Sequence, residues 1–404
     1  MKVVFLADNR SCSENLTTEH GLSVYVETDR HKVLLDTGTS DLFIRNAEIQ
    51  GIDLSAVDYV FISHGHSDHI GGLPYFVKVN EKAKIILSPF IEGGYYVSKR
   101  NHVHSITTKL DFDAIRDRII AADRNFDIDD ELSVIADIPY IEAMPEGNCN
   151  LYRNDDNGEL VRDDFCHETA MRVGSLLFTG CAHHGIMNIM RAVDFVPYYV
   201  IGGFHLLDDY ESDENINRIA ATLTTDYPDT MFYTGHCTGN KCIERLKNAM
   251  GGNIDNFCLG YHIPDIRIRQ LKNIDDKTAR TIGRLVRQLS VTSPIPDEDF
   301  LKEITESDNS RLFVMTYDEK IIGMAVLCRC IMPTGVKYWI EDVTIDSEYR
   351  GRHLGRRLVN YLTGTLPPHS TVLLTSRPSR TAANAMYTKL GFIKRETNVY
   401  KKEV

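Results

Sequence analysis

Six residues directly after one apolar run constrain this chain more than any other feature. The run V-D-Y-V-F-I-S is followed at once by H-G-H-S-D-H, residues 64–69. Three imidazoles and a carboxylate packed this closely at a strand end are unfavourable unless a cation binds them. His64 and His66 project to one side and can bind one metal, whereas Asp68 and His69 follow on the next turn and can bind a second. The spacing predicts a two-metal hydrolytic centre, and therefore an enzyme, with Asp68 also taking part in catalysis.

Three later apolar runs end in residues of the same kind. They are S-L-L-F-T-G-C-A-H-H-G, Y-Y-V-I-G-G-F-H-L and M-F-Y-T-G-H-C-T-G. Ligands bind at strand ends in α/β sheets, so one sheet can bring these residues to the edge that carries the first cluster. The candidates added in this way are Cys181, His183, His184, His205 and His236.

The pattern of apolar runs predicts two α/β domains. A chain of 404 residues exceeds what one hydrophobic core usually organises. Strand-like and helix-like segments alternate over the first 90 residues, which predicts a layered α/β sheet. Between 91 and 165 only a helix-like D-A-I-R-D-R-I-I-A-A-D and a turn at N-D-D-N-G-E stand out. A new strand, I-R-I-R-Q-L, and a capped amphipathic helix then begin, so we place the domains at 1–263 and 264–404.

The charge distribution supports two units with different partners. Residues 266–404 hold 23 Lys and Arg against 16 Asp and Glu, whereas residues 1–265 hold 22 against 41. A basic second unit suits an anionic cofactor. The acidic first unit argues against a nucleic-acid partner, so we expect small-molecule substrates. The sequence does not indicate an oligomeric state.

Cysteine usage and hydropathy predict a cytoplasmic protein without a membrane partner. The nine cysteines are scattered and form no C-x-x-C pair. This argues against a disulfide framework and for a reducing compartment. The N-terminal apolar run is too short for a signal peptide, and no run reaches the ~18–20 residues that a membrane span needs.

The first two-thirds of the chain resembles a known family. F-I-S-H-G-H-S-D-H-I-G-G-L is similar to the metal motif of the metallo-β-lactamase fold, and D-T-G at 36–38 is similar to its upstream turn. Five further motifs resemble the dihydropterin-ribofuranosylaminobenzene-phosphate synthase-like branch of that fold. They are G-L-S-V-Y-V-E, G-I-D-L-S-A-V-D-Y-V, L-L-F-T-G-C-A-H-H-G-I-M-N-I, V-I-G-G-F-H-L and G-H-C-T-G. The resemblance covers about residues 1–260 and implies an αββα sandwich.

The resemblance also implies two divalent transition metals, with zinc as the expected ion. His64, His66 and a later histidine would bind one metal, and Asp68, His69 and His236 the other. His183 matches the family's T-G-C-x-H better than His184 does, so His183 is the expected later ligand.

Two positions of that site leave alternatives open. Cys181 stands where many relatives carry a bridging Asp, and a thiolate favours softer ions such as zinc. His205 is either a substrate-facing donor, which we prefer, or a further ligand. The expected reaction is hydrolysis of a phosphodiester or related phosphorylated small molecule, and the alternative is hydrolysis of a lactone or thioester.

The second unit carries a basic turn that opens a helix. The run I-E-D-V-T-I-D-S-E-Y-R-G-R-H-L-G-R-R-L-V-N-Y-L predicts a strand, a turn and a helix. Backbone N–H groups at a helix N-terminus bind anions, and Arg350, Arg352, Arg356 and Arg357 add positive charge. A pyrophosphate would fit there.

This turn resembles the acetyl-CoA loop of the GCN5-related N-acetyltransferase (GNAT) family, R/Q-x-x-G-x-G/A. Arg350 and Gly355 match its first and last positions, but His353 replaces the middle Gly. S-R-T-A-A-N-A-M-Y-T-K-L-G-F is similar to the family's late helix and strand, and the match covers 266–404. The cofactor would be acetyl-CoA. The residues implied in its binding are Val343, Arg350, Arg352, His353, Leu354, Gly355, Arg356 and Asn384.

The same resemblance assigns two catalytic residues. Tyr387 would protonate the leaving thiolate, and Glu341, beside Asp342 at a strand end, would take the proton of the amine. We therefore predict a bifunctional enzyme, a two-metal hydrolase fused to an N-acetyltransferase. The alternative keeps the hydrolase and makes the second unit a non-catalytic module that senses acyl-CoA, which the histidine at 353 would allow.

Overall fold

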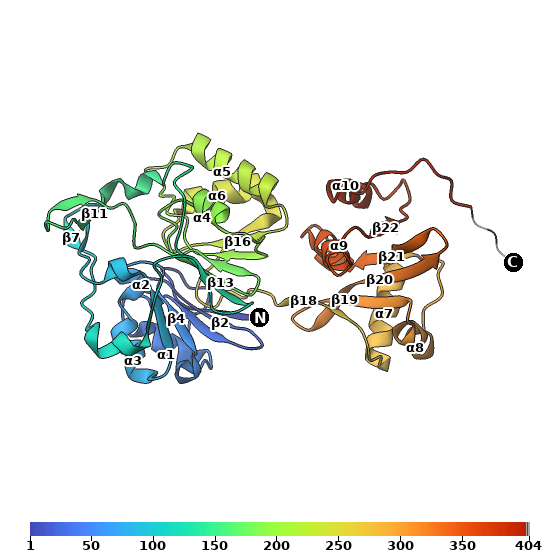
Figure 1. Cartoon of the computed structure of the whole chain (residues 1–404), viewed down its shortest axis with the longest axis horizontal. Helices are drawn as coiled ribbons and strands as arrows, with labels where there is room; N and C mark the ends of the chain where they lie inside the picture. The colour runs from blue at the N-terminus through green and yellow to red at the C-terminus, as the bar shows by residue number, and fades with distance from the viewer. Residues whose placement is uncertain (401, 403–404) are drawn as a thin grey trace. The chain divides into compact units, whose positions relative to one another are not determined.

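The structure is a computed structural model that describes residues 1–400 and 402. It separates the chain into two compact units, Met1–Ile263 and Pro264–Val404, each built on its own sheets (Figure 1). In the part of the chain that the structure describes, no helix combines the length and the apolar character that a bilayer crossing requires.

The first sheet of the first unit has the strand order β1-β2-β3-β4-β5-β8. β1 to β3 run antiparallel, and β3, β4, β5 and β8 run parallel, so several of its loops leave from one edge. The strands are β1 (Lys2–Ala7), β2 (Ser23–Glu27), β3 (Lys32–Leu35), β4 (Tyr59–Phe61), β5 (Lys84–Leu87) and β8 (Ile119–Ala121).

The second sheet has the order β17-β16-β15-β14-β13-β10-β9, and β14 to β17 run parallel. The strands are β9 (Phe126–Asp127), β10 (Leu132–Ile135), β13 (Ala170–Val173), β14 (Leu176–Phe178), β15 (Tyr199–Ile201), β16 (Met231–Thr234) and β17 (Ile254–Asn256).

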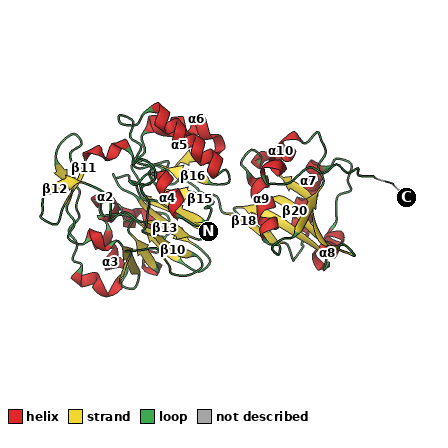
Figure 2. Ribbon diagram, turned by 45° about the horizontal axis from the view of Figure 1, so that its top comes forward, coloured by secondary structure: helices red, strands yellow, loops and turns green. Residues whose placement is uncertain are grey.

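The two sheets pack face to face between two layers of helices (Figures 1 and 2). Apolar side chains of both sheets form one core, in which the rings of Phe61 and Phe178 meet edge to face at 6.3 Å between centroids. Burial of such side chains is the main stabilising contribution to a fold of this kind. The helices of the first sheet are α1 (Leu42–Ile49), α2 (Ser67–Ile70) and α3 (Leu73–Val79), and those of the second are α4 (Ile186–Ala192), α5 (Asp213–Asp226) and α6 (Asn240–Met250).

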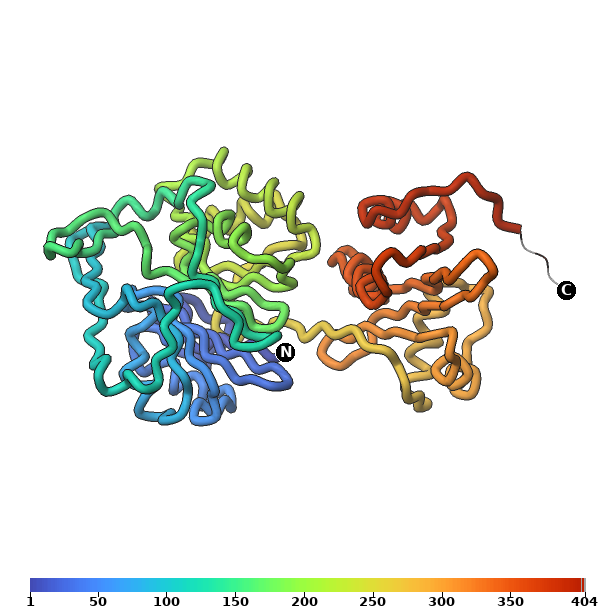
Figure 3. The backbone as a smooth tube through the Cα atoms, viewed as in Figure 1, coloured from blue at the N-terminus to red at the C-terminus, as the bar shows by residue number. Residues whose placement is uncertain are grey.

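The segment 91–165 departs from the sequence-based expectation. The run expected as a helix is a short 3₁₀ helix, Asp113–Arg118, followed by β8, because Ile119–Ala121 pairs in parallel with β5. Tertiary pairing outweighs the local helical pattern here. The rest of the segment forms a four-stranded sheet beside the sandwich, which Figure 3 traces in cyan to green. Its strands are β6 (Tyr96–Ser98), β7 (His104–Ser105), β11 (Leu151–Asn154) and β12 (Leu160–Arg162).

The structure has a disulfide bond between Cys12 and Cys258, which the expectation of a reducing compartment without a disulfide framework did not include. A sequence separation of 246 residues hides the pair. The fold brings the two segments together, because Ser11 and Leu259 form an isolated β-bridge beside the bond.

The second unit is one five-stranded sheet with helices on both faces. The strand order is β18-β19-β20-β21-β22, antiparallel except for the last pair. α7 and α8 pack against one face, and α9 and α10 against the other. The elements are β18 (Ile266–Gln270), α7 (Asp276–Leu289), α8 (Glu298–Glu306), β19 (Ser310–Tyr317), β20 (Lys320–Met332), β21 (Gly335–Ile345), α9 (Leu354–Gly364), β22 (Thr371–Leu374) and α10 (Thr381–Lys389).

Candidate metal centre and candidate acyl-transfer site

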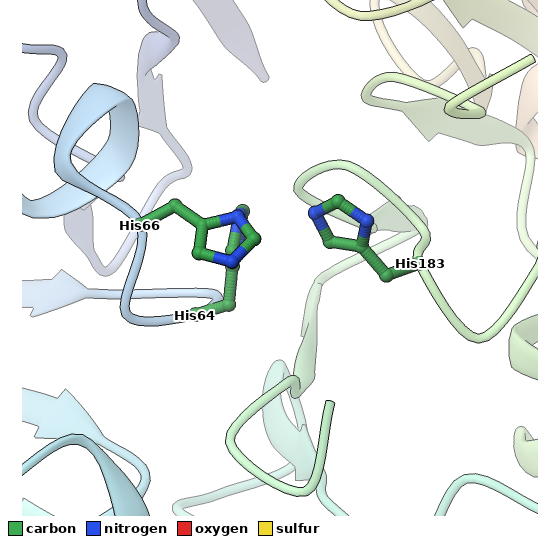
Figure 4. Close-up of side chains that lie close together, drawn as sticks. All are labelled: His64, His66 and His183. Atoms are coloured by element: carbon green, nitrogen blue, oxygen red, sulfur yellow. The ribbon is translucent and has the colours of Figure 1, made fainter. Parts of the chain in front are cut away.

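Three imidazoles converge from two loops to form a first donor group (Figure 4). His64 and His66 follow β4 of the first sheet, and His183 follows β14 of the second. Their ligand atoms lie within 4.8 Å of one another, and all three side chains are buried. The group has the number and type of donors with which a protein holds one transition-metal ion.

Hydrogen bonds from outside the group decide which nitrogen of His64 and His183 is left as a donor. Ser63 Oγ donates to Asp36 Oδ2 at 2.7 Å, so its 2.9 Å contact with His64 Nδ1 is one in which the imidazole donates. His183 Nδ1 donates in the same way to Asn148 Oδ1 at 2.9 Å. Nε2 of each histidine is buried without a hydrogen-bond partner among the described residues. Both rings therefore turn a free lone pair toward the group's centre.

His66 is oriented by a buried carboxylate. Its Nε2 lies 3.4 Å from Asp163 Oδ2, which also accepts from His167 Nε2 at 3.2 Å. His167 Nδ1 accepts from the backbone N–H of Gly65 at 3.0 Å, so its proton is on Nε2. This chain of hydrogen bonds leaves Nδ1 of His66 as the nitrogen that can bind a metal.

A second donor group lies beside the first. His69 Nε2 is 3.1 Å from both Cys181 Sγ and His236 Nε2, and His236 Nε2 is 3.2 Å from Asp68 Oδ2. His69 Nδ1 donates to Asp36 at 2.6 Å, and His236 Nδ1 donates to the side-chain oxygen of Asn9 at 3.0 Å. The two Nε2 lone pairs therefore face each other, which is unfavourable unless a cation or a proton lies between them.

The charges around both groups suit cation binding. Burial first, and then neighbouring imidazoles, lower the pKa of His64 and of His183 well below the usual range, which keeps these ligands neutral. Burial opposes the charge on Asp68, but the adjacent histidines outweigh it and lower its pKa. Burial also opposes the charge on His69, but Asp36 and Asp68 outweigh it and raise its pKa to about 9.

Cys181 lies between the two donor groups. Its sulfur is within 4.8 Å of donor atoms in sets that include His64 with His69, and His183 with His205. Cys181, His183 and His205 line a cavity of about 510 Å³. Cys181 thus stands where one atom can contact cations in both groups.

The structure places His205 and His184 differently. His205 lines the cavity, its ring centroid is 4.3 Å from that of His183, and both its nitrogens are buried without a hydrogen-bond partner among the described residues. His184 instead turns away, because its Nδ1 lies 2.7 Å from Glu168 Oε2 and its Nε2 3.0 Å from Tyr140 Oη. His184 therefore supports the loop and offers no free nitrogen.

In the second unit, the basic turn runs from the end of β21 to the start of α9. His353, the residue before α9, has φ 55°, a left-handed conformation that favours glycine. The N–H groups of the first helical turn have no partner within the helix, so they can bind an anion. Leu354 and Gly355 begin α9, and Leu354 is buried.

The side chains expected at the cofactor have varied contacts. Arg350 Nε donates to the carbonyl of Ile345 at 2.9 Å, so part of this side chain supports the turn. The Arg352 guanidinium lies 5.6 Å above the ring of Tyr349. Asn384 Nδ2, on α10, donates to the carbonyl of Arg377 at 2.9 Å. Arg356 lies on the first turn of α9, and Val343 lines a second cavity.

Glu341 and Tyr387 line that same cavity, which measures about 870 Å³. Burial and then the charge of Asp342 raise the pKa of Glu341. Burial also raises the pKa of Tyr387, which keeps the phenol protonated. A protonated phenol and a carboxylate of raised pKa in one cavity can serve as a general acid and a general base.

Comparisons with known proteins agree with the geometry of the first unit. A model of the metallo-β-lactamase superfamily matches residues 16–92. The uncharacterized protein MJ0448 of Methanocaldococcus jannaschii is 26% identical over 270 residues, 64% of this chain and 97% of the relative. The 7,8-dihydropterin-6-methyl-4-(β-D-ribofuranosyl)-aminobenzene-5′-phosphate synthase of the same organism is 27% identical over 246 residues, 55% of this chain and 82% of the relative. The crystal structure of Tm1679, a metal-dependent hydrolase of the β-lactamase superfamily, superposes with a TM-score of 0.55 and 28% identity, covering 65% of this chain and 98% of Tm1679.

A model of the acetyltransferase (GNAT) family matches residues 281–392. Glucosamine 6-phosphate N-acetyltransferase of Arabidopsis thaliana is 31% identical over 105 residues, 24% of this chain and 69% of the relative. The chain therefore carries a metallo-β-lactamase domain in its first unit, and its second unit belongs to the GNAT family. The predicted fold, an αββα sandwich followed by a mixed α/β GNAT domain, is confirmed.

Several residues of the metallo-β-lactamase domain contact the candidate ligands without having been singled out from the sequence. Most orient an imidazole, as Asp36, Asn148 and Asp163 do. Glu168 accepts from the backbone N–H groups of both His183 and His184, at 2.6 and 2.8 Å. The turn D-T-G and the pair at 167–168 were the available signals, because buried carboxylates beside histidines usually orient ligands.

Two further donors were also missed. His20 Nε2 lies 3.3 Å from Asp68 Oδ2 at the cavity's edge. Cys237, next to His236, brings a second thiol within 4.8 Å of donor atoms of Cys181 and His236. Its sulfur occupies space that a Cβ at Gly203 would fill, since that Cβ would lie 2.2 Å from it. The Gly-Gly of G-G-F-H therefore makes room for this thiol.

Proposed function

We propose that the metallo-β-lactamase domain is a two-metal hydrolase. The observation that carries this proposal is the pair of adjacent donor groups. The nitrogen lone pairs of each group point toward one common position, and Cys181 lies within reach of both groups. His64, His66 and His183 would hold one cation. Asp68, His69 and His236 would hold the other, with Cys181 between them. A donor set of imidazoles and a thiolate fits zinc.

The chemistry of such a pair is hydrolytic. Bound divalent ions lower the pKa of water to about 7 and stabilise negative charge on a leaving oxygen. Asp68 contributes a carboxylate that is 18% exposed to the cavity and is held by His20 and His236. It is placed to accept a proton from water or to pass one to the leaving group.

The rim of the cavity supports an anionic substrate. Arg100, His102, His104 and His20 all line it, in a domain that is acidic overall. A guanidinium and imidazole N–H groups at a cavity mouth can donate hydrogen bonds to a bound phosphate. A phosphodiester or related phosphorylated small molecule is therefore the substrate class we propose, and a lactone or thioester remains the second candidate.

Metal analysis of the purified full chain tests the centre. We expect close to two transition-metal ions per chain, and we expect His66→Ala to lose most of them. His102→Ala removes a rim histidine outside both donor groups and should keep its metal. A full metal complement in His66→Ala would contradict the assignment.

An activity panel tests the substrate class. Bis-p-nitrophenyl phosphate, a homoserine lactone and an acyl thioester separate the candidates, with the metal-depleted protein as the blank. Turnover of the phosphodiester should exceed that of the other two. Preference for the lactone or the thioester would establish the second candidate.

For the GNAT domain we propose acetyl transfer from acetyl-CoA to an amine. The N-terminus of α9 would bind the pyrophosphate through its backbone N–H groups. Glu341 would take a proton from the amine, whose nitrogen forms a bond to the acetyl carbon as the C–S bond breaks. Tyr387 would protonate the departing thiolate. The shared position of Glu341 and Tyr387 on one cavity supports these roles.

Calorimetric titration of the full chain with acetyl-CoA tests the cofactor, and His353 offers a sharper test. His353→Gly removes both the left-handed strain and a side chain at the anion-binding turn, so we expect acetyl-CoA to bind several-fold more tightly. His369, at φ 62° in an exposed loop, is the matched control, and His369→Gly should leave affinity unchanged. Weaker binding in His353→Gly would show instead that the imidazole contacts the cofactor.

Together the two domains make a bifunctional enzyme that acts on small molecules. A non-catalytic acyl-CoA-sensing domain is the alternative. Release of free CoA in the presence of an amine separates the two, because a sensing module would bind acetyl-CoA without releasing CoA.

A further inference from the structure

The cavity of about 870 Å³ in the GNAT domain opens where two parallel strands part. β21 pairs with β22 from Lys337 with Thr371 to Ile340 with Leu374. The residues just beyond this pairing, 341–343 and 375–377, line the cavity. The two strands therefore diverge around it, and the cavity extends from this gap to the face of the sheet that α7 and α8 cover.

The helices α7 and α8 line the outer wall of this cavity with apolar residues, and the segment between them also contributes Ser290, Ser293 and Asp297. Every residue that α7 and α8 contribute to the lining is apolar: Ile282, Val286, Leu289, Phe300, Leu301 and Ile304. Ile295, on the segment between the two helices, adds to this wall and packs so closely on α7 that a Cβ at Gly283 would lie 2.6 Å from it. Ile295 and Phe300 are each 54% exposed. Apolar surface of this kind gains free energy when a ligand covers it.

The inner wall carries two successive carboxylates. Glu341 and Asp342 both line the cavity, because a register shift between β20 and β21 and a left-handed φ of 53° at Asp342 interrupt the alternation of the strand. Neither carboxylate makes an ion pair with another described residue. Arg380, which also lines the cavity, opposes the effect of burial on Asp342 only in part, and its guanidinium donates to the carbonyl of Leu289 at 2.9 Å. Burial raises the pKa of both carboxyl groups, a cost that a bound cation would offset.

We propose that this cavity is the acceptor site and that its ligand is a primary amine with an apolar body, whose ammonium group contacts Glu341 and Asp342. The inference rests on the acetyl transfer proposed above and narrows the acceptor class. Sugar hydroxyl groups that faced Ile295, Phe300 and Ile304 would find no hydrogen-bond partner there. Arg377 and Arg380 also line the cavity and can donate to a phosphate, so glucosamine 6-phosphate is the competing ligand in the test.

Calorimetric titration of the full chain, with and without saturating CoA, tests the proposal with three probes. They are 2-phenylethylamine, its neutral isostere 2-phenylethanol, and glucosamine 6-phosphate. The amine should bind about tenfold or more tightly than either of the others. Tighter binding of glucosamine 6-phosphate, or equal binding of amine and alcohol, would overturn the proposal.

Variants separate the two halves of the site. Asp342→Asn keeps a residue that tolerates the left-handed conformation and should weaken the amine about fivefold or more while sparing the alcohol. Phe300→Ser should weaken both probes about tenfold. Ile331→Ser, at a residue 66% exposed and outside the cavity, should change neither. An amine affinity indifferent to both Asp342→Asn and Phe300→Ser would place the amine elsewhere and refute the assignment.

The titration also separates this inference from the proposed transfer. Failure of CoA to bind would contradict the transferase proposal alone, because the amine titration without CoA still reports on the cavity. Conversely, release of CoA with a hydrophilic amine, but no binding of 2-phenylethylamine, would keep the transferase and refute the acceptor class.

Discussion

At the scale of single residues, Asp8 carries an electrostatic cost close to the candidate metal centre. It is fully buried after β1, next to Asn9, whose side chain holds His236. One carboxylate oxygen accepts from the backbone N–H of Arg10 at 2.9 Å, and the other has no hydrogen-bond partner among the described residues. Burial outweighs these contacts and raises the pKa of Asp8 to about 6.

This pKa predicts a pH dependence of stability. The folded-state pKa is above the unfolded value of 3.8, so protonated Asp8 favours the folded state below pH 3.8 and this contribution is lost as the pH rises through 6. We compare the two proteins with a chelator present, so that both are free of metal. The unfolding free energy should then fall between pH 4 and pH 8 by about 2–3 kcal/mol less in Asp8→Asn than in the parent protein. Denaturant titrations across this range measure it. The exposed Asp156→Asn is the control, and parallel curves for Asp8→Asn and the parent protein would refute the assignment.

Single residues also show how far the sequence could predict the site. His64, His66, His69, His183 and His236 could be singled out because each follows an apolar run at a strand end. Asp163 could not, because it lies in the segment 91–165, where no periodicity marks the elements. Its role depends on a hydrogen bond to a residue 97 positions away. Such contacts are set by packing and have no local signature.

At the scale of elements, the loop after β14 must approach the loop after β4 closely. Gly180, just beyond β14, has φ 57°, and a Cβ there would lie 2.3 Å from Ser63 Oγ. Ser63 accepts the proton of His64, so any displacement of this contact also displaces a candidate ligand. A side chain at this position would therefore strain the loop and displace Ser63.

A pair of glycine variants separates the effect of backbone strain from the effect of displacing Ser63. Gly180→Ala should lower the unfolding free energy by about 3 kcal/mol or more and reduce metal content. Gly174 has φ 58°, and nothing lies within 4 Å of the position that a Cβ would take there. Gly174→Ala therefore carries only the backbone strain, about 1 kcal/mol, and should keep its metal. Denaturant unfolding with metal analysis measures both. Equal effects of the two variants would show that the contact with Ser63 is unimportant.

Helices and strands could be predicted where the spacing of apolar residues in the sequence agreed with the strand pairing in the fold. The strand and helix expected at the start of the second domain are β18 and α7, and the helix has the Asp275 cap that its sequence indicates, with the side chain accepting from Thr278 N. The helix expected around Ile119 is wrong, because the apolar residues of that run fit both the spacing of a helix and the alternation of a strand. Only its pairing with β5 decides between them.

At the scale of the whole molecule, each domain has its own hydrophobic cores. Three clusters lie within residues 1–263 and two within 264–404. Domains with separate cores unfold as separate cooperative units. Ligands that bind one native domain should therefore stabilise that domain alone.

Scanning calorimetry should accordingly resolve two transitions. Acetyl-CoA should raise only the transition of residues 264–404, and a chelator should lower only that of residues 1–263. The two domains expressed alone assign the transitions. One transition that responds to both additives would show that the domains are thermodynamically coupled.

The candidate ligands come from both sheets of the sandwich, and this has a kinetic consequence. His69 meets Cys181 across 112 residues and His236 across 167. Contacts of such long sequence separation form late, after the chain has closed its longest loops. Interactions formed after the transition state slow unfolding and leave the folding rate unchanged. Bound metal would therefore lengthen the lifetime of the folded domain without helping it to fold, and a metal-poor chain would reach the same structure at the same rate but hold it for less time.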